Sequence, residues 1–124
     1  AGYCRAVRSG RWITVSGTAA AADPEASDLG GETYRQTVAA FESGLAAIRD
    51  LGGSPAMVVR TRMLLAPEAD WREASRAHST CFDAVRPANT TVYIARLIPP
   101  GALVEIEVDA YLTDAASSEG QTGE

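Results

Sequence analysis

Three carboxylates in the last predicted strand form the clearest group of side chains that could do chemistry. Glu105, Glu107 and Asp109 alternate with apolar residues in "LVEIEVDAYL" (103–112), so they share one strand face at about 7 Å per step. Such a row can bind a hard cation or supply an acid/base pair. More commonly it forms ion pairs with arginines on neighbouring strands, and three are available: Arg60, Arg62 and Arg96. For Glu105, a place in a ligand cleft is the second interpretation.

A second group lies in "RPANTTV" (86–92), where a proline-containing loop leads into a predicted strand over 89–97. Ligand sites often form at such loop-to-strand junctions. Asn89 opens the strand, and its amide can hydrogen-bond a carboxylate but cannot neutralise it. Arg86 carries a positive charge three residues earlier. Pro87 favours an extended conformation at Arg86, so the guanidinium would reach the junction only through a bent loop.

The remaining reactive side chains fit structural roles better than catalytic ones. His78 is the only histidine, and it falls on the inner stripe of a predicted helix, where a hydrogen-bonded structural histidine is commoner than a general base. Ser16 has no identifiable base, which disfavours a hydrolase triad. Cys4 and Cys81 are too far apart for a CxxC motif, so we expect buried thiols and no metal site. The absence of lysine excludes Schiff-base chemistry through that residue.

Composition indicates an ordinary globular domain. The chain has 124 residues, of which 46% are hydrophobic and 22% charged, enough for one domain with a real core. Its net charge of −5 disfavours a nucleic-acid surface, which needs a cluster of basic residues. No run approaches the roughly 18 apolar residues of a membrane span, and the N-terminal residues lack the apolar region of a signal peptide. We therefore expect a cytoplasmic protein with neither a nucleic-acid nor a membrane partner.

The periodicity of apolar residues predicts two helices and a mixed sheet. Helices are expected from Glu32 to Gly52 and from Pro67 to about Val85, with Trp71 and Phe82 among the core residues of the second; Phe82 could also wall a cleft. The strands are expected over 4–8, 11–16, 55–65, 89–97 and 103–112. In the strand over 55–65, Val58, Arg60, Arg62 and Leu64 should share one face, with Val59 on the other.

These elements predict an α+β domain over residues 1–113, in which two helices cover one face of the sheet. The opposite face alternates charge with Leu and Tyr, which suits burial in an oligomer with charged rows paired within or across subunits. The tail, "TDAASSEGQTGE" over 113–124, has too few apolar residues to order itself. We expect residues 114–124 to be flexible.

Four segments in this order and spacing resemble the RidA family, also called YjgF/YER057c/UK114, over roughly residues 3–112. They are "YCRAVRSGRWITVSGTA", "ETYRQTVAAFESGLAAIRDLGGSPAMVVRTRMLL", "HSTCFDAVRPANTTVYIARL" and "ALVEIEVDAYL". The resemblance implies a chorismate-mutase-like fold and a homotrimer whose sheets form a central barrel. It also implies small-molecule clefts between subunits, and no cofactor.

The resemblance further implies which residues line the cleft. Tyr3, Ser16 and Gly17 match family cleft positions, and Glu105 matches a glutamate thought to position the water that attacks an imine. Active relatives have an arginine at the position of Asn89, where its guanidinium holds the substrate carboxylate. Thr90 and Thr91 occupy the next two positions, where those relatives have serine and often cysteine. Arg86 is a candidate replacement for the missing carboxylate anchor.

Two hypotheses of function follow. In the first, the protein is a RidA-like enzyme or binder that acts on an imine-like substrate, with Glu105 as the catalytic residue, although the loss of the arginine disfavours the classical 2-iminobutanoate/2-iminopropanoate deaminase reaction. In the second, it is a non-catalytic trimer that binds a metabolite or a protein and regulates it. The two differ in one observable, because only an enzyme has turnover to lose when Glu105 is changed to Gln.

Overall fold

The structure is a computed structural model that describes residues 1–113 and 120–123. Residues 114–119 and 124, which make up most of the predicted flexible tail, lie outside the described residues. Among the described residues, no helix has both the length and the apolar character needed to cross a membrane.

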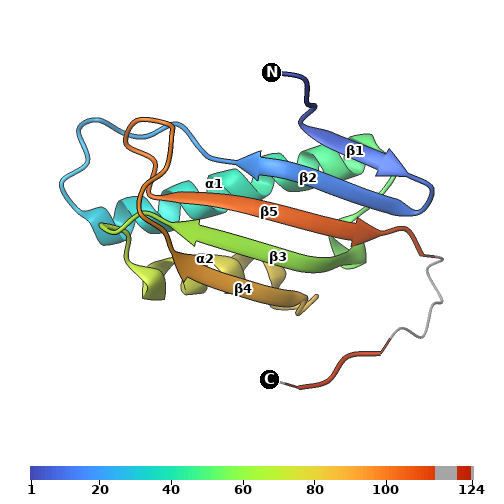
Figure 1. Ribbon diagram of the computed structural model, residues 1–124. Coiled ribbons are helices and arrows are strands. Elements are labelled where there is room, and N and C mark those ends of the chain that lie inside the picture. Colours follow the sequence, from blue (N-terminus) through green and yellow to red (C-terminus); the bar gives the residue numbers. More distant parts are fainter. Residues whose placement is uncertain (114–119, 124) are drawn as a thin grey trace.

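The predicted α+β class is confirmed. A five-stranded mixed sheet has the strand order β1-β2-β5-β3-β4, in which only the β3–β4 pair is parallel. Both helices cover the same face of this sheet, and its other face is open (Figure 1). The strands are β1 (Ala6–Ser9), β2 (Trp12–Thr18), β3 (Val58–Leu65), β4 (Ala88–Tyr93) and β5 (Val104–Tyr111). The helices are α1 (Leu29–Asp50) and α2 (Trp71–Phe82), with a short 3-10 turn at Pro55–Met57.

Helix boundaries follow the capping residues rather than the apolar pattern. Asp28 caps α1 by accepting a hydrogen bond from the Gly30 amide, so α1 begins before the predicted Glu32. Gly52 then ends it with φ +96°, as glycine after a helix commonly does. The predicted start of α2 at Pro67 was wrong, because Asp70 caps the helix by accepting from the amides of Arg72 and Glu73.

The core lies between the helices and the covered sheet face. Phe41 and Ile48 of α1 are fully buried, and Phe82 of α2 is 1% exposed. They pack against inward-facing strand residues: Ile13, Val15, Met63, Leu65, Val104, Ile106 and Val108. The prediction that Trp71 belongs to this core was wrong, because it begins α2 at the rim and is 46% exposed.

Two strand predictions also need correction. The pairing of β3 with β5 shifts between Val58 and Arg60, so Val58 turns into the core while Val59 is 42% exposed. The bulge therefore reverses the faces predicted for these two residues. The expected strand over 89–97 ends at Tyr93, which pairs with Leu65, the last residue of β3. Because β4 is the edge strand and pairs with β3, it has no partner strand beyond that point among the described residues.

A buried polar cluster fixes the loops at one end of the domain. Gln36 accepts from the Leu103 amide at 2.8 Å and donates to the Gly101 carbonyl at 3.1 Å and to Glu32 at 2.9 Å. Glu32 also accepts from Arg35 and from the Asp23 amide. The Arg35 hydrogen bonds lower the pKa of Glu32 to about 2. One amide and one carboxylate thus tie α1 to the two loops that precede α1 and β5.

We expect Gln36→Met to destabilise the protein by about 1–3 kcal/mol, because the buried Leu103 amide would lose its hydrogen bond to Gln36 while side-chain volume stays similar. The measurement is the free energy of unfolding from urea denaturation near pH 7. Ala46→Met, at an exposed position of the same helix, is the control and should change it by less than about 0.5 kcal/mol. Equal effects of the two variants would contradict this account.

Candidate functional site

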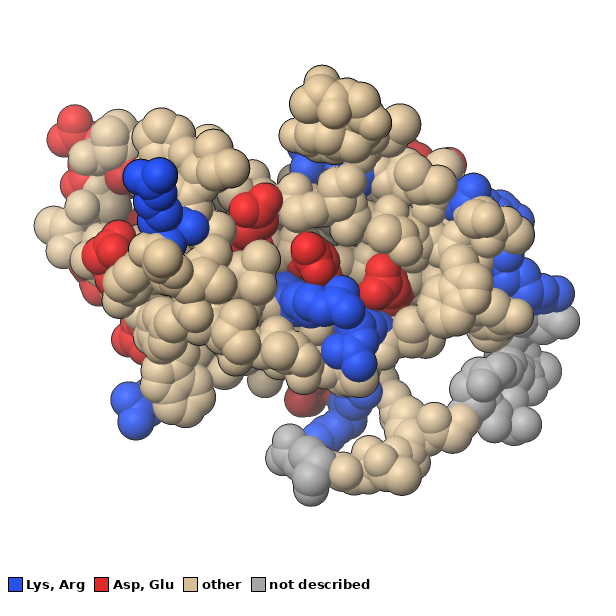
Figure 2. Space-filling view, viewed as in Figure 1, with Lys and Arg blue, Asp and Glu red and all other residues tan. Residues whose placement is uncertain are grey.

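The open face of the sheet holds the row of carboxylates. Arg62 lies between Glu107, at 3.2 Å, and Asp109, at 3.7 Å, and Thr14 donates to Asp109 at 3.0 Å. Figure 2 shows acidic side chains in a row across the middle of this face, with basic side chains beside the row. The ion-pair interpretation therefore holds for Glu107 and Asp109. Among the described residues, Glu105 takes part in none of these ion pairs.

Glu105 instead lies against Gly17. The pairing of β2 with β5 shifts between Val15 and Thr18, and Gly17 sits in this irregularity. A Cβ on Gly17 would lie 2.6 Å from Oε1 of Glu105, so glycine is what lets the carboxylate approach the β2 backbone. The hydroxyl of neighbouring Ser16 donates to the Cys4 carbonyl at 2.6 Å. Tyr3, just before Cys4, is 77% exposed.

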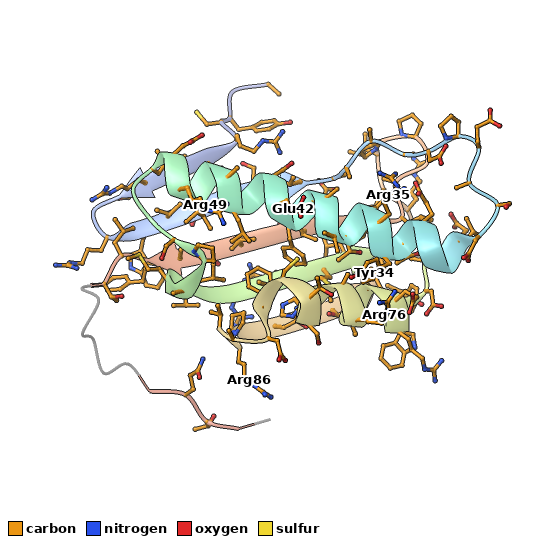
Figure 3. All side chains as sticks on the ribbon, turned by 180° about the vertical axis from the view of Figure 1, so that it is seen from behind. Tyr34, Arg35, Glu42, Arg49, Arg76 and Arg86 are labelled. Carbon is orange, nitrogen blue, oxygen red and sulfur yellow. The ribbon has the colours of Figure 1, made fainter. Side chains whose placement is uncertain are left out.

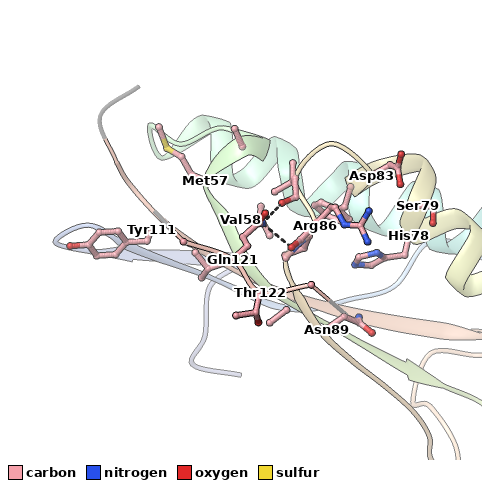
Figure 4. A pocket seen from close by; sticks show the side chains of 18 of the residues that line it. Met57, Val58, His78, Ser79, Asp83, Arg86, Asn89, Tyr111, Gln121 and Thr122 are labelled. Carbon is pink, nitrogen blue, oxygen red and sulfur yellow. Dashed lines mark hydrogen bonds between the residues drawn. The ribbon is translucent and has the colours of Figure 1, made fainter. Parts of the chain in front are cut away.

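A hollow lies at the end of the sheet where β3 and β4 begin, between α2 and the segment 120–123, and Trp12 and Tyr111 of the open face also line it (Figure 4). His78 and Phe82 of α2 line it, together with Arg86 and Asn89. Gln121 closes one side by donating to the carbonyls of Val85 and Arg86, at 2.6 and 3.0 Å. Three predicted site residues, Phe82, Arg86 and Asn89, therefore meet at one hollow.

Asn89 belongs to a chain of hydrogen bonds on the helix-covered side. Its Nδ2 donates to Thr61 Oγ1 at 3.0 Å, and its Oδ1 accepts from Thr91 at 2.8 Å. Thr61 is fully buried and its hydroxyl also meets Nε2 of His78 at 2.7 Å. The Thr61 hydroxyl has one proton and two lone pairs, so it accepts from Asn89 and at the same time hydrogen-bonds His78.

The surroundings of His78 favour its neutral form. The imidazole packs against Phe41 and Phe82, with ring centroids 5.5 and 4.8 Å away, and this burial lowers its pKa below the usual 6.5. Cys81, one turn further along α2, is half-buried. Burial and the charge of Glu42 raise the pKa of its thiol to about 11, so it is a poor nucleophile at neutral pH.

Arg86 does not adopt the extended conformation expected before Pro87. It has a left-handed φ of +55°, and its amide donates to the Phe82 carbonyl at 2.8 Å, which completes the C-terminal cap of α2. This turn directs its side chain to the part of the hollow where His78 and Ser79 lie (Figure 4). The loop therefore has the bend that the Arg86 guanidinium needs to approach the start of β4.

The predicted cleft residues fall into two groups that a single chain does not bring together. Asn89 and Thr91 contact the helix-covered side through Thr61, whereas Glu105 lies on the open side beside Gly17. Thr90 also faces the open side, where Arg60 approaches its hydroxyl at 3.5 Å. The sheet thus separates the carboxylate from the amide.

The contact between Thr61 and His78 was missed by the sequence analysis. His78 was placed on the inner stripe of its helix, and Thr61 alternates with Arg60 and Arg62 along its strand, so each is a polar residue at a core position. Two polar side chains facing the same core favour a hydrogen bond between them. That combination is the signal that could have predicted the pair.

The architecture defines an α+β domain of the chorismate-mutase-like type. A crystal structure of a Mycobacterium tuberculosis member of the YjgF/YER057c/UK114 family superposes with a TM-score of 0.77 and is 38% identical, covering 90% of this chain and 87% of that one. A Streptomyces coelicolor protein described as uncharacterized is 38% identical over 110 residues, or 89% of this chain and 81% of its own length. A RutC family protein of Pyrococcus abyssi is 30% identical over 88% of this chain and 85% of its own length.

The family model described as Endoribonuclease L-PSP matches residues 1–112. The chain therefore belongs to this family, the YjgF/YER057c/UK114 or RidA family that the resemblance indicated.

We expect stability to depend on pH through His78. Since its pKa is lower in the folded than in the unfolded chain, the unfolded chain binds more protons below about pH 6.5. The free energy of unfolding should therefore be at its plateau above that pH and decrease as pH falls from 6.5 toward 5. Urea denaturation across this range measures the slope. His78→Gln should flatten it, and an unchanged slope in that variant would show that another group is responsible.

Proposed function

We propose that the protein is a homotrimer that binds a small metabolite in clefts between subunits. The observation that carries this proposal is the separation of Glu105 and Asn89 by the sheet of one chain. A cleft containing both requires the open-face group of one subunit to approach the helix-side group of another. Three such clefts arise in a trimer with cyclic symmetry.

The open face supports association. Besides the ion pairs of Arg62, it exposes the large apolar side chains of Trp12 and Val92, at 51% and 42%. Trp12 packs edge-on against Tyr111 with ring centroids 4.9 Å apart. A sheet face that combines paired charges with exposed aromatic and aliphatic groups is typical of a surface covered by another subunit. Closing three such faces into a barrel would bury them together.

Glu105 is the proposed catalytic residue if the ligand reacts. Its carboxylate would orient a water whose oxygen bonds to the carbon of a C=N group; the C–N bond then breaks, ammonia leaves with the transferred protons, and a carbonyl product remains. The position beside Gly17 leaves the carboxylate outside the described ion pairs and free to accept from that water.

A non-catalytic binding role is the second candidate, and Asn89 is the observation that favours it. A neutral amide provides no charge for a carboxylate substrate, and both ends of this amide are already hydrogen-bonded to Thr61 and Thr91. The classical 2-imino acid is therefore a poor match for the cleft. The name of the family model suggests RNA cleavage, but a net charge of −5 opposes RNA binding.

We expect the protein in solution to have three times the 13.0 kDa chain mass, measured by light scattering coupled to size exclusion. Val92→Arg should shift it toward monomer, because the new charge would be buried in the interface. Ala46→Arg, at an exposed position on α1, is the matched control and should leave the trimer intact. A monomeric natural protein would refute the proposed clefts.

Asn89→Arg should create or raise the hydrolysis of freshly generated 2-iminopropanoate, because the guanidinium would supply the missing carboxylate anchor. We expect little turnover by the natural sequence, and loss of the gained activity when Glu105→Gln is added to Asn89→Arg. The measurement is the disappearance of the imine with time against a protein-free control. Rapid turnover by the natural sequence would show that another group, such as Arg86, already anchors the carboxylate. If neither the natural protein nor the Asn89→Arg variant hydrolyses the imine, the non-catalytic role is favoured.

A further inference from the structure

The side-chain amide of Asn89 is held in one orientation from both ends. Thr61 Oγ1 accepts from its Nδ2, and Thr91 donates to its Oδ1, at 3.0 and 2.8 Å. Thr61 is itself fully buried and also hydrogen-bonded to His78 at 2.7 Å. The Asn89 amide is therefore held at its Nδ2 end by a residue of the core and at its Oδ1 end by Thr91.

This arrangement leaves a defined pattern of hydrogen-bonding groups for a ligand. A carboxamide has two N–H donors and two acceptor lone pairs, and one of each is used by the two threonines. Asn89 is exposed at the hollow, so one N–H and one carbonyl lone pair remain available there. A carboxylate can satisfy only the N–H, because it has no donor for Oδ1.

The charged side chains at the hollow do not favour a ligand of either sign over the neutral ligand that Asn89 would select. Arg86 and Asp83 both line it, so one cation and one anion lie near the ligand. Neither makes a salt bridge with another described residue. The selection among ligands of similar size then rests with the oriented amide rather than with net charge.

We propose that the cleft recognises a neutral group with an N–H next to a C=O, as in an amide, lactam or ureide, through paired hydrogen bonds to Asn89. Thr61 and Thr91 are positioning residues that hold the amide for this contact. The inference rests on the proposed small-molecule cleft and names the class of its ligand. A site built around a donor–acceptor pair discriminates against analogues that lack one partner.

The test uses the 124-residue chain labelled with nitrogen-15 and three small probes. 2-Pyrrolidinone carries the N–H and C=O, N-methyl-2-pyrrolidinone lacks the N–H, and butanoate carries a carboxylate. The side-chain NH₂ signals of Asn89, assigned by their loss in Asn89→Asp, should shift on titration with 2-pyrrolidinone. Loss of one hydrogen bond of ordinary strength should weaken binding of the other two probes by about tenfold.

Variants distinguish the residue that contacts the ligand, Asn89, from the two residues that position it, Thr61 and Thr91. Asn89→Asp removes both N–H groups and should abolish the preference for the lactam, as followed by ligand-detected NMR. Thr91→Val should reduce the preference while Asn89 is still present, because the amide is free to turn over. Thr61→Val should act in the same direction, and Thr91→Val carries the test if the buried Thr61 variant fails to fold.

Equal or tighter binding of butanoate would overturn the inference and identify an anion site, while leaving the metabolite cleft in place. No response of Asn89 to any probe at about 0.1 M, where fragments of this size bind a matching site, would overturn it as well. The existence of the intersubunit cleft is tested by a different measurement, the mass of the trimer. A failure of the proposed ligand class can therefore be distinguished from a failure of the proposed cleft.

Discussion

The alternation of side chains across a single sheet is the constraint on which the rest of this molecule depends. Successive residues of a strand point to opposite faces, and both helices cover the same one. Figure 3, from behind, shows α1 and α2 side by side over that face. Every second residue of β5, and of β3 after its bulge, is thereby buried in the core, and the residues between them, including Glu105 and Arg62, are left on a face that this chain does not cover.

The same constraint decides what each half of the site can become. On the covered side a polar residue must find a partner within the core, and Thr61 finds two, His78 and Asn89. On the open side charged residues pair laterally, as Arg62 does with Glu107 and Asp109. Asn89 is therefore part of a neutral network rooted in the core, while Glu105 is part of a charged surface. An arginine at position 89 would bring its charge next to the neutral His78–Thr61 pair and would lose the two hydrogen bonds that hold the present amide.

Much of the fold could be predicted from the sequence because it depends on periodicity. The helical period of the apolar residues in α1 and the strict alternation in β5 predicted the right elements, the right layers and the exposed row of charges. The errors lie where one local interaction outweighs the pattern. The Asp70 cap, rather than Pro67, starts α2 and leaves Trp71 at the rim. The bulge in β3 exchanges the faces of Val58 and Val59, and no pattern of residue types marks its position.

The candidate site was harder to predict for the same physical reason. Sequence spacing places residues on a face but does not show which of them bond, so Thr61 and His78 were assigned separately. The conformation of Arg86 was also not predictable from the sequence. Pro87 favours an extended conformation at the residue before it, but Arg86 lies at the end of α2 and has a left-handed φ of +55°. Glycine would adopt a positive φ at a lower conformational free energy, so the backbone conformation does not explain why position 86 is an arginine. A strained backbone that directs a cation into a hollow is the kind of local cost found at binding sites, and it makes Arg86 the charged counterpart of the neutral Asn89 at the same hollow.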